Sequence, residues 1–167
     1  MKDLKIPSVV RLVLSLALLA GCETAQQYGA PLPKGTQTRI AFNTSDTLYT
    51  GGLGEAGVEG FCRRIRNYLV KNLADRGITA ASDSDGSGAY AQITITLSSI
   101  ESKVGENVGF FVSFASYKPH VKYSATLESP SGTTVATWRH EVDEDTVDKL
   151  SEHMAADIAK YLSRGFR

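Results

Sequence analysis

The sequence predicts an α+β fold, a two-layer sandwich in which two helices cover one face of an antiparallel sheet. Residues 58–76 and 147–162 place apolar side chains three and four residues apart, as amphipathic helices do. Residues 91–97, 121–127 and 135–142 alternate apolar and polar side chains, as half-buried strands do. With one strand ahead of the first helix, the order is β-α-β-β-β-α. Three strands in series predict an antiparallel meander.

The size and charge of the chain limit its function. It has 167 residues, with 18 basic and 18 acidic side chains. This length is enough for one domain with a hydrophobic core. The balanced charge lacks the basic footprint of a nucleic-acid-binding protein, so we expect no nucleic-acid partner.

The first half of the domain is predicted to be a strand followed by a helix. The strand covers residues 39–42 and ends in a polar turn at 43–46. The helix covers residues 58–76, and Gly77 suits its C-terminal cap. Its apolar stripe consists of Val58, Phe61, Cys62, Ile65, Tyr68, Leu69 and Leu73.

The second half is predicted to be the meander and the last helix. The alternation of residues 91–97 slips at Ser98 and Ser99, which indicates a bulge. We expect turns at 105–109 and 130–132, and a helix that begins near Asp145 as N-cap. The apolar stripe of this helix consists of Val147, Leu150, Met154, Ile158, Tyr161 and Leu162.

The first 22 residues have the pattern of a secretory leader. An apolar run covers residues 9–20, with Lys2 and Lys5 ahead of it and Arg11 near its start. The run is shorter than the roughly 20 residues of a membrane-spanning helix. The run ends in Leu19-Ala20-Gly21-Cys22, which resembles the lipobox of bacterial lipoproteins. The resemblance implies a signal peptide at 1–21 and lipid on Cys22. It also implies a lipidated N-terminus and flexible tether at 22–37, and a single α+β periplasmic domain at 38–167. Glu23, in place of aspartate, favours the outer membrane over the inner membrane.

No pattern in the sequence indicates catalysis or metal binding. No GxSxG or HExxH motif occurs, and residues 50–57 lack phosphate-loop spacing. Residues 83–94 match a calcium loop only in part, because Thr94 stands where a glutamate is required. We expect His120, His140 and His153 at the surface and Cys62 buried. The prediction is a protein that is not an enzyme and has no metal and no cofactor.

The aromatic run at 110–117 is the candidate contact site, with Phe110, Phe111, Phe114 and Tyr117 as its residues. Consecutive Phe110 and Phe111 place apolar groups on both faces of a strand. Either both faces are covered within the fold, or one face contacts a partner or the membrane. In a ligand-binding alternative, Phe110, Phe111, Phe114 and Trp138 line a pocket for a small or lipidic molecule.

The order of elements also resembles that of YajG-type periplasmic lipoproteins and of CsgG-type and TolB N-terminal domains. The resemblance is carried by the helix end at 73–78, the strand at 91–97, the hairpin at 121–142 and the helix segment at 154–158. It implies an interaction or assembly module for an envelope complex, with a protein partner and self-association. The alternative is a ligand-binding carrier or sensor lipoprotein.

Overall fold

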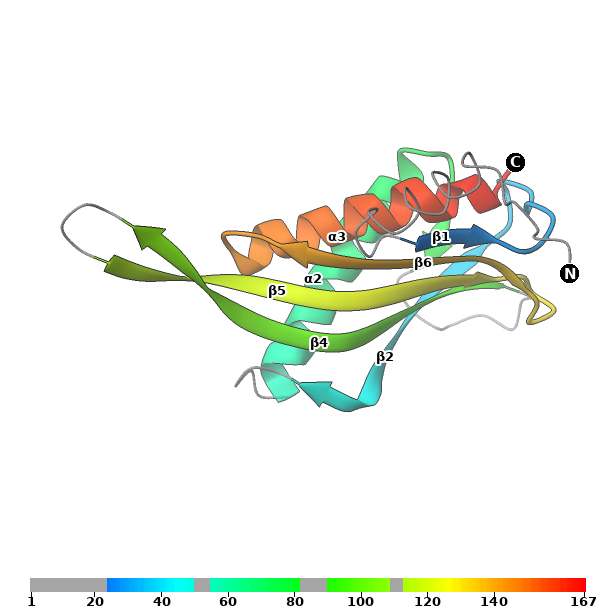
Figure 1. Cartoon of the computed structure of the whole chain (residues 1–167). Coiled ribbons are helices and arrows are strands. Elements are labelled where there is room, and N and C mark those ends of the chain that lie inside the picture. Colours follow the sequence, from blue (N-terminus) through cyan, green and yellow to red (C-terminus); the bar gives the residue numbers. More distant parts are fainter. Residues whose placement is uncertain (1–23, 50–54, 82–89, 109–112) are drawn as a thin grey trace, which may run out of the picture.

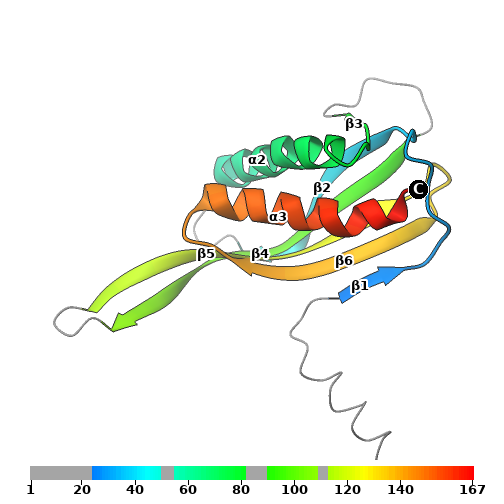
Figure 2. The same ribbon diagram turned by 90° about the horizontal axis from the view of Figure 1, so that it is seen from above.

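The computed structural model describes residues 24–49, 55–81, 90–108 and 113–167 (Figure 1). Its strands and helices, in chain order, are β1 (Thr24–Gln27), β2 (Thr38–Tyr49), α2 (Glu55–Ala74), β3 (Ala80–Ala81), β4 (Ala91–Val108), β5 (Ser113–Glu128), β6 (Thr134–Asp143), α3 (Val147–Leu162) and the 3-10 turn η1 (Ser163–Gly165). The strands form one sheet in the order β1-β6-β5-β4-β2-β3. Helices α2 and α3 lie side by side on one face of it (Figures 1 and 2). The predicted α+β class is confirmed.

The sheet combines the predicted meander with a parallel pair. Strands β4, β5 and β6 are antiparallel neighbours, as the sequence predicts. Strand β2 pairs with β4 in parallel, and α2 lies in the connection between them. A parallel pair needs such a crossover, because a tight turn cannot return the chain in the same direction. The expectation of a purely antiparallel sheet is therefore wrong for β2.

The core lies between the sheet and the helices. The central residues of both predicted apolar stripes are buried, and alternate residues of β4, β5 and β6 pack against them. The buried members of the two stripes are Phe61, Ile65, Leu69, Leu73, Leu150, Met154, Ile158 and Leu162. The other face of the sheet carries the polar alternates of the same strands.

Three local predictions are confirmed in detail. Gly77 has a φ of 73°, and its N–H and that of Ile78 bond the carbonyls of Ala74 and Leu73. This is the hydrogen-bond pattern of a Schellman cap. The pairing of β4 with β5 shifts register between Leu97 and Ser99, where the bulge is expected. Gly132, with a φ of 81°, lies in the predicted β5–β6 turn.

Two predicted turns are wrong, because strand pairing extends across polar residues, and the predicted N-cap of α3 is wrong by one residue. Strand β2 continues past the turn expected at 43–46, and β4 continues to Val108 through the turn expected at 105–109. Residues 109–112, between β4 and β5, lie outside the described residues. Thr146, not Asp145, caps α3, and its side chain accepts a hydrogen bond from the N–H of Lys149.

The segment expected to be a flexible tether is paired with the domain from Thr24 onward. Strand β1 is antiparallel to β6, with Thr24 opposite Arg139 and Gln27 opposite Ala136. Farther on, the N–H of Leu32 bonds the carbonyl of Gly165, and the N–H of Arg167 bonds the carbonyl of Leu32. The open edge of β6 offers unpaired backbone groups, and this segment satisfies them. Residues 1–23 lie outside the described residues.

Candidate functional site

The β4–β5 hairpin extends beyond the rest of the molecule. Residues 102–108 pair with 113–119, and we call this two-stranded ribbon the arm. The pairing of β6 with β5 ends at His120, and that of β2 with β4 ends at Ser99, so within the described residues no third strand flanks the arm. Figures 1 and 2 show it projecting past both helices. An isolated two-stranded ribbon is only marginally stable in water, so the arm is a candidate interaction element.

Two of the four predicted contact residues map to the arm. Phe114 lies opposite Asn107, and Tyr117 lies opposite Val104. Phe110 and Phe111 fall outside the described residues. Of the predicted contact residues, Phe114 and Tyr117 thus lie on the β5 strand of the arm.

Trp138, the fourth residue of the ligand-pocket alternative, is packed in the core. Its side chain is 1% exposed, and its ring stacks on Tyr161 with 3.6 Å between centroids. Its Nε1–H donates to the hydroxyl of Tyr123 at 3.3 Å. The ring therefore presents no free surface to a ligand.

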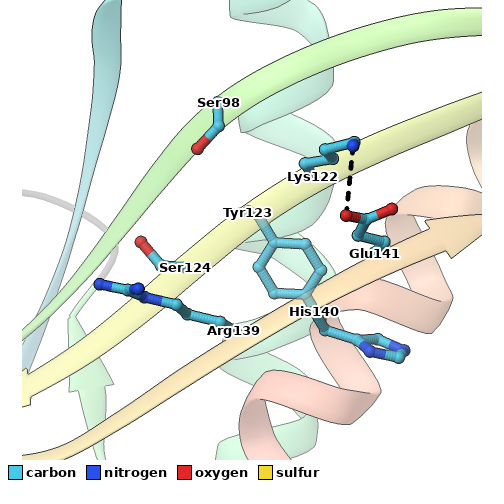
Figure 3. A pocket seen from close by; sticks show the side chains of 7 residues that line it. All are labelled: Ser98, Lys122, Tyr123, Ser124, Arg139, His140 and Glu141. Carbon is cyan, nitrogen blue, oxygen red and sulfur yellow. Dashed lines mark ion pairs between the residues drawn. The ribbon is translucent and has the colours of Figure 1, made fainter. Parts of the chain in front are cut away.

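A concavity of about 340 Å³ lies on the sheet face opposite the helices (Figure 3). It adjoins the β4 bulge, and it is lined by Ser98, Lys122, Tyr123, Ser124, Arg139, His140 and Glu141. Lys122 and Glu141 form an ion pair across it, with 3.2 Å between Nζ and Oε1. A bulge bends its strand and disturbs the ladder, which accounts for a hollow in an otherwise continuous sheet face.

His120 is buried, contrary to the expected surface position. Its side chain is 1% exposed and lies between two carboxylates on β6. Its Nδ1 contacts Oδ1 of Asp143, and its Nε2 lies 3.7 Å from Oε2 of Glu141. The cross-strand pairing of His120 with Asp143 produces this contact, which spacing along the chain does not reveal.

Of the other two histidines, His153 lies on α3, and His140 lies on β6 beside that helix. Nδ1 of His153, which is exposed as expected, is 2.7 Å from Oε1 of Glu144. His140 is half-buried, with its Nε2 3.7 Å from Oδ2 of Asp157. Among the described residues, no group of three or more histidine, cysteine or acidic side chains has the arrangement of a metal site.

Cys62 is half-buried on α2, less enclosed than the sequence suggests. Burial raises the pKa of its thiol, and the charge of Arg66 opposes this effect only in part. A nucleophilic cysteine needs a lowered pKa, so the surroundings of Cys62 do not activate it.

Comparison with solved structures shows a similar fold in PelC of Paraburkholderia phytofirmans. One PelC dodecamer structure matches with a TM-score of 0.52 and 18% identity, over 84% of this chain and 96% of that chain. A dodecamer of a PelC variant with a single substitution matches with a TM-score of 0.53 and 12% identity, over 86% and 99%. At this identity the likeness concerns the fold. No protein-family model matches the sequence, and no curated protein matches it.

Sequence reasoning missed the arm and the concavity. The arm has no clear signal in the sequence, because residues 102–108 do not alternate apolar and polar side chains regularly. The concavity has no signal either, because Ser98, Lys122 and Arg139 come from three strands. None of the helices in the described part of the chain is long and apolar enough to span a bilayer.

Proposed function

We propose that this chain is a lipid-anchored, non-catalytic assembly protein of the bacterial envelope. In this proposal Cys22 carries the lipid, the domain faces the periplasm from the outer membrane, and copies associate through the arm. The leader and its Leu19-Ala20-Gly21-Cys22 sequence support the anchor. Several acyl chains make such an anchor stable, whereas one chain binds only marginally.

The arm is the observation that carries the assembly role. Its outer backbone edges have no strand partner within the described residues, and such edges pair readily with another chain. The aromatic run adds apolar groups at its end, the residue type enriched in interface cores. The dodecamers formed by PelC, a protein of similar fold, support association between copies of this chain.

The test is the mass of the full chain purified in a non-ionic detergent, measured by native mass spectrometry. We expect a discrete oligomer, and we expect Phe114→Ser combined with Tyr117→Ser to reduce it to monomer. The matched control is Tyr28→Ser, because Tyr28 is an aromatic that is 61% exposed away from the arm. Circular dichroism melting verifies that each variant is folded.

Two results would contradict the proposal. A monomeric parent chain at micromolar concentration refutes assembly, and an unchanged oligomer in the folded arm variant refutes the arm as the interface. Metabolic labelling with palmitate tests the anchor separately. Cys22→Ser should abolish the label, and a label that persists in this variant refutes lipidation at Cys22.

A further inference from the structure

Strand β1 places the N-terminal end of the described chain beside the concavity. Thr24 is the Cα partner of Arg139, which in turn lies opposite Ser124 of β5. Cys22 precedes Thr24 by two residues, so covalent geometry keeps their Cα atoms within about 7 Å. A lipid on Cys22 therefore holds this edge of the sheet at the bilayer surface, where phosphate groups are concentrated.

The concavity offers the donors that a phosphate group requires. Arg139 is exposed, and its guanidinium makes no ion pair or hydrogen bond with any described residue, which leaves its five side-chain N–H donors available. Lys122 adds a second cation, and Ser98 and Ser124 add hydroxyls on the same lining (Figure 3). A guanidinium matches phosphate geometry with two parallel hydrogen bonds.

The bulge also leaves a buried hydroxyl next in sequence to the lining residue Ser98. Ser99 lies opposite Lys122 in the pairing of β4 with β5, so the two side chains share a face of the sheet. Ser99 is 8% exposed, and its Oγ has no hydrogen-bond partner among the described residues. A buried hydroxyl without a partner is costly, and buried polar groups are normally satisfied. Ser99 directly follows Ser98 but is not itself a lining residue, so the phosphate donors of the concavity are Arg139, Lys122, Ser98 and Ser124.

Glu141 is the one carboxylate on the lining, and it is already engaged. Its Oε1 pairs with Lys122, and its Oε2 lies 3.7 Å from Nε2 of His120. Of the two lining cations, Lys122 is paired with Glu141, and Arg139 has no ion-pair partner among the described residues. The remaining charge of the site is positive.

We infer that this concavity binds a phosphate group, and that in the membrane the group is a phospholipid headgroup beside the Cys22 anchor. The membrane source rests on the proposed lipid anchor, whereas the phosphate chemistry rests on the lining alone. Binding would orient the polar sheet face toward the bilayer and the helices away from it.

The test titrates the full chain in a neutral detergent with two probes, inorganic phosphate and dihexanoyl phosphatidylglycerol, by isothermal calorimetry. We expect saturable binding of the lipid, weakened at least tenfold by Arg139→Gln, because a charged hydrogen-bond pair is lost. Glu141→Gln should strengthen binding several-fold by removing the opposing charge and freeing Lys122. The matched control is Arg63→Gln at an exposed position of α2, which should leave the affinity unchanged.

The outcomes separate the two sources and the two proposals. Binding of the lipid but not of millimolar inorganic phosphate supports the headgroup. Equal binding of inorganic phosphate overturns the membrane source, and binding of neither probe overturns the site. Oligomer mass and palmitate labelling are measured on the same samples. Lost phosphate binding with both of these retained refutes this inference and leaves the assembly role standing.

Discussion

Replacing Gly165 with alanine tests how closely the C-terminal 3-10 turn packs against the core. A Cβ at this position would lie 2.6 Å from Cδ2 of Leu127 and 3.3 Å from Cγ1 of Val135. Both neighbours are buried, so neither can move into open space. The carbonyl of Gly165 also accepts the N–H of Leu32 at 2.7 Å, which fixes the segment that follows β1. Gly165→Ala should therefore disturb both the core and this segment.

The magnitude follows from the two opposing effects. Overpacking a filled core costs about 1–3 kcal/mol. The smaller entropy of the unfolded alanine chain returns roughly 0.4–1 kcal/mol. With the middle of each range the net loss is about 1 kcal/mol, and at roughly 2–4 °C per kcal/mol the melting temperature falls by about 2–4 °C. Differential scanning calorimetry measures the fall, and tryptic cleavage after Lys34 should become faster.

The control is the same substitution at Gly60, which lies inside α2. No atom lies within 4 Å of a Cβ built there, outside the local backbone of the helix. Gly60→Ala should raise stability by about 0.5–1 kcal/mol, because glycine is a poor helix former. If the Gly165 variant melts as high as the Gly60 variant, the argument for tight packing around Leu127 is refuted.

Three further predictions concern single groups. Because burial raises the pKa of Cys62, iodoacetamide at pH 8 should alkylate it more slowly than free cysteine, and the difference should vanish in urea; equal rates in the folded chain would contradict the burial. Hydrogen bonding and charge from Lys118 lower the pKa of Asp145, so this pair stabilises the fold above the ordinary carboxyl pKa and loses its effect as pH falls through the lowered value. An NMR titration should show that pKa rise in Lys118→Met. Thr146→Ala removes the acceptor for the N–H of Lys149 and should cost about 1 kcal/mol in urea unfolding, whereas Asp145→Ala should cost less.

The sequence predicts those features of the fold that depend on the burial of one face within a single helix or strand. The apolar stripes of α2 and α3 follow from helical periodicity, and the bulge follows from the slip of alternation at Ser98 and Ser99. Gly77 and Gly132 follow from backbone conformations that side chains disfavour. Each of these signals lies within a few neighbouring residues.

The predictions of strand boundaries were wrong because these boundaries depend on pairing with distant strands. Polar residues at 43–46 and 105–108 look like turns when read alone, yet pairing with β4 and β5 carries them on as strands. The segment after Thr24 looks like a linker, because its composition is small and polar. Its strand conformation comes from the exposed edge of β6, and a local pattern cannot show an edge.

The same distinction between local and distant contacts applies to the candidate site. The sequence by itself determined the order of the two long helices and the four longer strands, and it predicts the leader and the aromatic contact site, because these patterns depend on residues close together in the chain. Only the tertiary structure decided that His120 is buried between Glu141 and Asp143, and that Ser98, Lys122 and Arg139 share a concavity. The physical reason is the register of β4, β5 and β6, which sets residues far apart in sequence side by side.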